Sequence, residues 1–106
     1  MKKIYVVMEG DSFTSEIDSS RAETHEMLAA FTSKEDAINY LPMALNRKVN
    51  KLANGKEGSS DCQWRVTPYD GYEHPEVYKS AISYEDDYYD GMYFYFVDEL
   101  ILDPEN

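Results

Sequence analysis

Residues 3–9 are rich in β-branched and aromatic residues, residues 63–69 alternate apolar with polar side chains, and one segment follows the period of a helix. The last strand-like segment, residues 92–102, is apolar on both faces except at Asp98 and Glu99, which is typical of a central strand that a helix covers. Residues 24–31 also have a helix-like spacing, but their place just before a helix cap favours the second strand of a hairpin. The five predicted strands are residues 3–9, 24–31, 63–69, 77–84 and 92–102.

The sequence predicts one helix over residues 33–53. Ser33 stands at the N-cap position, and Asp36 three residues later completes a variant of the capping box. Pro42 lacks a backbone donor, so we expect it to bend the helix or break it in two. Asn54 and the glycine after it provide a C-cap. The apolar stripe consists of Ala37, Ile38, Leu41, Ala44, Leu45, Val49 and Leu52.

Turn-forming residues separate these elements. Gly10 ends the first strand, and the polar residues 11–21 predict a loop. Residues 86–91 predict a turn whose final glycine tolerates positive φ. Together the elements predict an α+β fold: a mostly antiparallel sheet of four to five strands, with one main helix (about residues 33–53) packed on one face. A chain of 106 residues forms a single domain, because a split would leave pieces too small to bury a core.

Composition indicates a folded chain that stays in the cytoplasm. Apolar residues make up 42% of the sequence and aromatic residues 14%, which supplies enough material for a core. Only five apolar residues, 4–8, follow the N-terminal lysines, and no segment approaches the roughly 20 apolar residues of a membrane span. The single cysteine, Cys62, cannot form an internal disulfide, which favours a reducing compartment. We therefore expect a cytoplasmic protein that contacts no membrane.

Charge is distributed unevenly. Of the net charge of −11, residues 1–72 contribute −2 and residues 73–106 contribute −9, with Lys79 as the only base of the second part. A smaller acidic stretch, residues 9–26, has six acids and only Arg21 as a base. Direct binding of nucleic acid needs a basic surface, so we expect this chain not to bind nucleic acid directly. An acidic surface can also serve solubility alone, and this alternative stays open.

The sequence predicts no catalytic residue, no metal site and no cofactor. A calcium loop that started at Asp86 would place Tyr88 third and Val97 twelfth, where such a loop needs oxygen ligands. Neither histidine has a cysteine or a second histidine at metal-binding spacing. Cys62 follows an aspartate, which disfavours the thiolate. The glycines of residues 54–60 do not follow the order of a phosphate-binding loop.

Tyrosines and acids gather in the last third of the chain. Eight of the ten tyrosines fall between Tyr69 and Tyr95, and core packing readily accounts only for those of the last strand. Tyrosine offers a large contact area with a polar end, and surrounding acids steer it towards a basic partner. The alternative is an aromatic sheet face with solvated acids. The predicted partner-binding patch consists of Tyr72, Glu73, Glu76, Tyr84, Glu85, Asp86, Asp87, Tyr88, Tyr89 and Asp90.

Three segments resemble a loose family of small uncharacterised proteins of bacteriophages and Gram-positive bacteria. Residues 1–7 match its M-K-K-x-Y-V-V strand, residues 31–41 (FTSKEDAINYL) match its strand-to-helix junction, and residues 93–103 (YFYFVDELILD) match its acidic, Tyr-rich last strand. The resemblance covers about a third of the chain and implies the fold and a phage-like origin. It transfers no catalytic residue. Residues 46–90 form a long insertion relative to the shortest members.

These observations lead to one functional hypothesis and two alternatives. We expect a non-catalytic acidic protein, a monomer or small homo-oligomer, that occupies the basic nucleic-acid-binding surface of another protein. Carboxylates at alternate strand positions lie about 6.6 Å apart, close to two phosphate steps of one DNA strand. The resemblance makes the specific form a phage-type, DNA-mimic-like inhibitor of a host defence protein, as anti-CRISPR and anti-restriction proteins are. The alternatives are a small phage accessory or assembly protein that self-associates through a sheet edge, and an enzyme.

Overall fold

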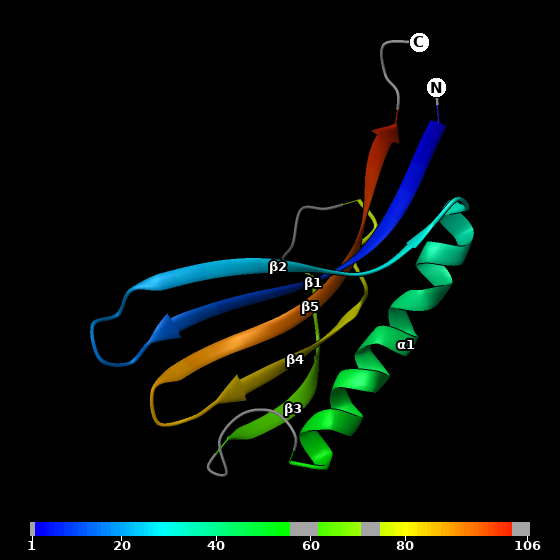
Figure 1. Ribbon diagram of the computed structural model, residues 1–106. Coiled ribbons are helices and arrows are strands. Elements are labelled where there is room, and N and C mark those ends of the chain that lie inside the picture. The colour runs from blue at the N-terminus through cyan, green and yellow to red at the C-terminus, as the bar shows by residue number, and fades with distance from the viewer. Residues whose placement is uncertain (1, 56–61, 71–74, 103–106) are drawn as a thin grey trace.

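The computed structural model describes residues 2–55, 62–70 and 75–102 of the chain. One helix lies across one face of a five-stranded antiparallel sheet with the strand order β2-β1-β5-β4-β3 (Figure 1). This arrangement confirms the predicted α+β fold, and β5 is the central strand, as expected. The elements are β1 (Lys2–Ser15), β2 (Arg21–Phe31), α1 (Lys34–Ala53), β3 (Gln63–Pro68), β4 (Ser80–Glu85) and β5 (Tyr89–Leu102).

[[FIG1]]

The first hairpin is longer than the sequence predicts. β1 continues to Ser15, although a loop is expected from residue 11. In this part of the strand Asp11 pairs with Thr24 of β2 on one side and with Tyr93 of β5 on the other. Hydrogen bonding on both sides offsets the low strand propensity of the glycine, aspartate and serine residues here. The predicted loop is therefore wrong up to Ser15, and the described turn is confined to residues 16–20.

Gly10 and Gly91 lie inside strands, and each faces an aromatic ring of the neighbouring strand. Gly10 pairs with Phe94, and Gly91 pairs with Tyr84. A Cβ atom on Gly10 would lie 2.1 Å from the Phe94 ring, and one on Gly91 would lie 2.3 Å from the Tyr84 hydroxyl oxygen. Such close approach of a ring to a backbone requires glycine. The interpretation of both glycines as turn residues is wrong, and the φ of Gly91 is not positive.

The helix begins and ends where the sequence predicts. The Ser33 hydroxyl accepts a hydrogen bond of 3.3 Å from the backbone N–H of Asp36, and Asn54 is the C-cap. α1 continues through Pro42 as one helix, so of the two expected outcomes, a bend or a break, the break is wrong. Burial of Leu41 before the proline and Ala44 after it offsets the missing hydrogen bond. The predicted stripe faces the sheet, and its buried members are Ala37, Leu41, Ala44, Leu45 and Leu52.

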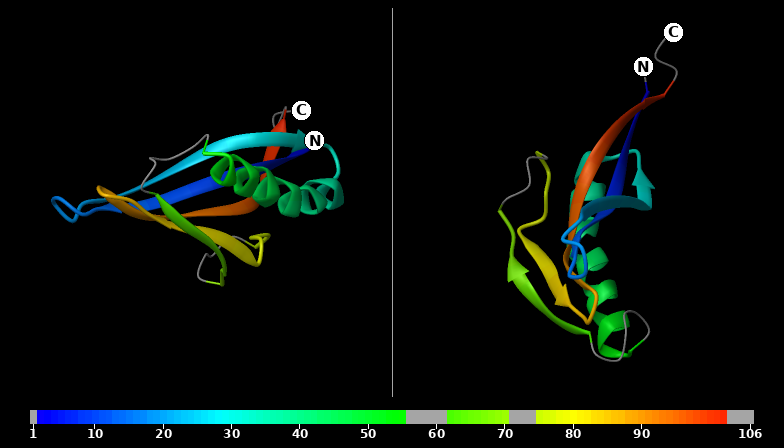
Figure 2. Two further views of the ribbon diagram at one scale, coloured as in Figure 1. Left: turned by 90° about the horizontal axis from the view of Figure 1, so that it is seen from below. Right: turned by 90° about the vertical axis from the view of Figure 1, so that its left-hand side faces the viewer.

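The sheet buries apolar side chains on both faces. On the helix face, Val7, Tyr95 and Val97 pack beneath α1. On the opposite face, Phe94 and Phe96 are almost fully buried without a helix above them. Side chains from the sheet and from the segment before β4 cover this second face, and Figure 2 shows β3 and β4 curving away from the plane of the other strands. In the described residues, no helix is long and apolar enough to span a bilayer.

[[FIG2]]

The two ends of the sheet differ. At one end, the β1–β2 turn and the β4–β5 turn lie beside each other (Figures 1 and 2). At the other end, the start of β1 and the end of β5 project as a two-stranded ribbon (Figures 1 and 2). The molecule is accordingly elongated, with a longest dimension of 50 Å.

Candidate functional site

The strongest concentration of charge lies where the two turns meet. We call this region the acidic tip and define it as residues 15–20 and 85–90. These twelve residues include six acids and no base. The acids are Glu16, Asp18, Glu85, Asp86, Asp87 and Asp90.

Backbone and aromatic contacts hold the two turns together. The backbone N–H of Glu16 donates a hydrogen bond of 2.8 Å to the carbonyl oxygen of Tyr88. One step inward, Ser15 pairs with Tyr89 in the sheet. The Phe13 and Tyr89 rings meet edge to face with 5.4 Å between their centroids. The tip is thus a continuation of the central β1–β5 pair, which fixes one turn relative to the other.

Two of the acids build the turns themselves. The Asp18 carboxylate accepts hydrogen bonds from the backbone N–H and the hydroxyl of Ser20, and these bonds lower the pKa of Asp18. The Asp86 carboxylate accepts hydrogen bonds of 2.8 Å from the backbone N–H groups of Tyr88 and Tyr89. Aspartate often stabilises turns in this way. Asp86 is therefore a structural residue of the turn as well as a charge.

Three of the other acids lie close enough to repel one another. Ligand oxygens of Glu16, Glu85 and Asp90 all lie within 4.8 Å of one another, and the three residues are exposed. The nearby Asp90 carboxylate is the main cause that raises the pKa of Glu16, with further contributions from Glu85 and Asp86. Three carboxylates offer the oxygen ligands that Ca²⁺ or Mg²⁺ prefers, although Ca²⁺ takes six to eight ligands.

Apolar side chains stand among these charges. Ile17 is 78% exposed and Tyr88 is 59% exposed, and both lie in the turns of the tip. Tyr89 is 43% exposed although its ring contacts Phe13. The tip thus combines exposed aromatic and aliphatic area with negative charge, a combination that suits a contact with a basic protein surface.

The structure brings six members of the predicted patch together and separates two others from them. Residues 85–90 form half of the tip. Tyr84 turns inward, where its ring stacks on Tyr93 at 4.7 Å between centroids and its hydroxyl donates a hydrogen bond of 2.7 Å to the Asp11 carboxylate. Burial and this hydrogen bond raise the pKa of Tyr84. Core packing therefore accounts for Tyr84, contrary to expectation, and likewise for Tyr78.

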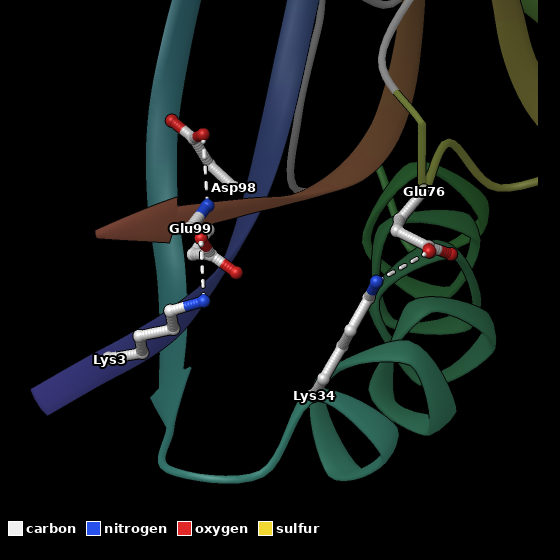
Figure 3. A network of polar contacts seen from close by, with 5 residues as sticks. All are labelled: Lys3, Lys34, Glu76, Asp98 and Glu99. Carbon is white, nitrogen blue, oxygen red and sulfur yellow. Dashed lines mark hydrogen bonds and ion pairs between the residues drawn. The ribbon is translucent and has the colours of Figure 1, made fainter. Parts of the chain in front are cut away.

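Glu76 lies away from the tip, near the start of α1 and the end of β5. Its carboxylate is 3.0 Å from the Lys34 ammonium, and a second ion pair of 3.6 Å joins Lys3 to Glu99 beside it (Figure 3). Tyr72 and Glu73, the last two members of the predicted patch, lie outside the described residues.

[[FIG3]]

A second polar cluster lies between α1 and the sheet. The Lys48 ammonium is 3.7 Å from the Glu9 carboxylate and 4.0 Å from the centre of the Tyr93 ring. The side chains of Lys48 and Glu9 are each only 11% exposed. The hydroxyl of the fully buried Tyr95 donates a hydrogen bond of 2.7 Å to Glu9. These contacts compensate the charges, so we interpret the cluster as part of the core.

Two hollows accompany these clusters. One of about 520 Å³ lies beside the tip, and Glu85 and Asp90 belong to its lining together with Trp64 and Arg65. The other, of about 210 Å³, lies between α1 and the first hairpin and includes Lys48 in its lining. Cys62 is partly buried, and burial raises the pKa of its thiol.

Sequence reasoning missed the contribution of the first hairpin. Glu16, Ile17 and Asp18 lie about 70 residues from the second turn in sequence but share the tip with it. The acidic stretch of residues 9–26 is the signal that could have found them, because a long β1 would carry that stretch to the end of the sheet. Comparison of the chain with protein-family models, curated proteins and solved structures gave no significant match.

Proposed function

We propose that this protein is a non-catalytic binding protein that places its acidic tip on the basic, nucleic-acid-binding surface of another protein. The observation that supports the proposal is the meeting of two turns from distant parts of the sequence, which gathers six acids and exposed apolar side chains at one end. Like charges held this close oppose folding. A basic partner would relieve this repulsion and would be steered to the tip by the same field.

The shape of the tip refines the expected mode of binding. Carboxylate oxygens of Glu16, Glu85 and Asp90 gather within 4.8 Å of one another and do not repeat along a strand. These residues therefore do not support a regular mimic of the phosphates along a DNA strand. The tip is better suited to a compact basic pocket or the mouth of a groove. Ile17 and Tyr88 then supply apolar contact beside the charges.

In its most specific form, the proposal makes the protein a cytoplasmic inhibitor of a host defence nuclease, of the anti-CRISPR or anti-restriction kind. The resemblance of residues 1–7, 31–41 and 93–103 to small phage proteins supports this form. Such an inhibitor needs no active site of its own, because it acts by blocking access of nucleic acid to the nuclease.

The experiment is capture of partners from a bacterial lysate on the immobilised protein, followed by elution with double-stranded DNA. A protein held through its nucleic-acid-binding surface is expected to leave the column with DNA, because both ligands compete for that surface. The test variant is Glu85→Lys with Asp87→Lys. It reverses two exposed acids of the tip and leaves the turn-forming Asp86 in place.

The matched control is Glu35→Lys with Asp70→Lys. It makes the same change in net charge at two exposed positions outside the tip. The control variant is expected to capture the same protein, and the tip variant is expected to lose it. Equal capture by both variants, or a captured protein that DNA does not displace, would contradict the proposal.

A further inference from the structure

The ribbon opposite the tip has unpaired strand edges. We call it the arm and define it as residues 2–4 of β1 and 98–102 of β5. Residues 2–4 pair with residues 100–102, and Asp98 and Glu99 pair with Val6 and Tyr5 of β1. The pairing of β1 with β2 begins at Tyr5, and on β5 the last bond to the segment before β4 joins the Val97 N–H to the Glu76 carbonyl oxygen. Within the described residues, both outer edges of the arm are therefore free.

The arm also exposes apolar side chains. Leu100, Ile101 and Leu102 are between 42% and 47% exposed, although they belong to a regular strand. An isolated two-stranded ribbon is marginally stable in water, and a free edge with apolar side chains readily accepts another strand. The arm thus has both the backbone groups and the apolar area that strand addition requires.

We infer that the arm pairs with the arm of a second copy of this chain, through the free edge of β5. In an antiparallel pair, the register centred on Leu100 is the one that matches all five free residues, 98–102, with each other. A centre one residue earlier would place the two Glu99 side chains directly opposite each other, which is unfavourable. The Leu100 register places Glu99 opposite Ile101 and Asp98 opposite Leu102.

Charge favours the same register. Within one copy, Lys3 pairs with Ile101, and Lys2 pairs with Leu102. Across the dimer, each carboxylate would therefore lie in the same row and on the same face as a lysine of the other copy, with one apolar residue between them. The spacing of two strands, about 10 Å, is within the combined reach of these side chains. Because Lys3 also lies 3.6 Å from Glu99 of its own copy, the second copy would extend an existing ion pair and add apolar cover.

This inference is independent of the proposed function. The arm and the acidic tip lie at opposite ends of the molecule (Figure 1). Dimerisation through the arms would leave both tips uncovered and pointing away from the shared edge.

The first test measures molecular mass by sedimentation from about 1 μM to about 1 mM, the range of dissociation constants of weak complexes. The mass is expected to rise from that of one chain to that of two. Leu100→Lys is expected to shift the midpoint at least tenfold towards higher concentration. Ile17→Lys, at a more exposed apolar position in the tip, is the matched control and is expected to leave it unchanged. A mass of one chain throughout, or equal effects of both variants, would overturn the inference.

The second test does not depend on the stability of the lysine variant. With Cys62 replaced by serine, Leu100→Cys should form a disulfide between two copies under mild oxidation. Directly opposed residues of antiparallel strands have Cα atoms about 4.5–5.5 Å apart, which a disulfide can span. Leu102→Cys should not cross-link, because the two copies of residue 102 would lie about 14 Å apart in this register. Failure of Leu100→Cys, or equal cross-linking at both positions, would overturn the register.

Discussion

Lys48 connects the helix to the polar part of the sheet. Its ammonium contacts the Glu9 carboxylate and the face of the Tyr93 ring in a place that is largely closed to water. A charge in such a place is tolerated only when its partner is present, because the desolvation of an unpaired ion is unfavourable. The sequence marks Lys48 as a cation in the C-terminal half of a helix, and its partner on a distant strand was not predictable from local pattern.

We predict that Lys48→Met destabilises the fold by about 3 kcal/mol, because it leaves Glu9 charged and unpaired. Lys34→Met is the control: it removes an ion pair at the surface, and the expected loss is less than about 1 kcal/mol. Denaturant unfolding measures both values. Adding Glu9→Gln to Lys48→Met should recover part of the loss. If the two single lysine variants lose equal stability, the pair is not a buried one.

At the tip, Glu16 should oppose folding at neutral pH. Its pKa is raised in the folded state, mainly by the Asp90 carboxylate, so the folded state binds the proton more tightly than the unfolded state. The stabilising contribution is present below the unfolded pKa and is lost as pH rises through the folded pKa. We expect Glu16→Gln to raise the melting temperature at about pH 7 and to weaken its dependence on pH between about 4 and 7. A lower melting temperature at neutral pH would contradict the repulsion described here.

The helix and the central strand were the elements that sequence reasoning predicted best. The stripe of α1 and its Ser33 cap carry local signals, and β5 reads as a long apolar run. The extension of β1 carries no such signal, because the poor strand formers Asp11, Ser12 and Ser15 surround its only two favourable residues, Phe13 and Thr14. Pairing with two neighbours decides the conformation there, and such pairing is a property of the whole sheet.

Two substitutions in and beside α1 test how the helix packs on the sheet. Leu41 of α1 is only 3% exposed, so Leu41→Ala is expected to destabilise the fold by about 2–5 kcal/mol. Ser33→Ala removes only a cap and should cost about 1 kcal/mol. Denaturant unfolding of the two variants gives the comparison. A Ser33→Ala effect larger than that of Leu41→Ala would contradict the assignment of the stripe as the main contact of α1.

The strand glycines lead to a second prediction at this scale. Gly10→Ala is expected to destabilise the fold by about 1–3 kcal/mol, because the new methyl group would overlap the Phe94 ring. The same substitution should cost less in a Phe94→Leu background, which leaves room above residue 10. Thermal unfolding of the four proteins measures this coupling. Additive effects of the two substitutions would show that the ring is not what requires glycine.

Across the whole molecule, strand order decides where the charge lies. The uneven charge along the sequence predicted an acidic last third, but not that residues 16–18 would join it. The antiparallel pairing of β1 with β5 brings together turns about 70 residues apart in sequence. Local sequence patterns do not indicate which strands pair, so the contribution of residues 15–20 to the tip could not be predicted. The inward orientation of the Tyr84 side chain likewise depends on partners in other strands, Asp11 and Tyr93.

Charge and apolar area at the tip should act on different rate constants. Tyr88→Ala is expected to raise the dissociation rate of a captured partner about tenfold or more, because an exposed ring of this size is suited to be a contact anchor. Salt should change this effect little, since buried apolar contact is not screened. Surface plasmon resonance at two salt concentrations measures it. An unchanged dissociation rate would remove Tyr88 from the interface.

The most direct test of the acidic tip is the association rate of the captured partner at about 50 mM and at about 500 mM salt. Exposed charges are screened much more strongly at the higher concentration. Steering by the tip predicts that Glu85→Lys with Asp87→Lys lowers the rate about tenfold at low salt and weakens its salt dependence. Glu35→Lys with Asp70→Lys, which has the same net charge, should lower the rate much less. Equal rates for the two variants, or a wild-type rate that ignores salt, would contradict the account.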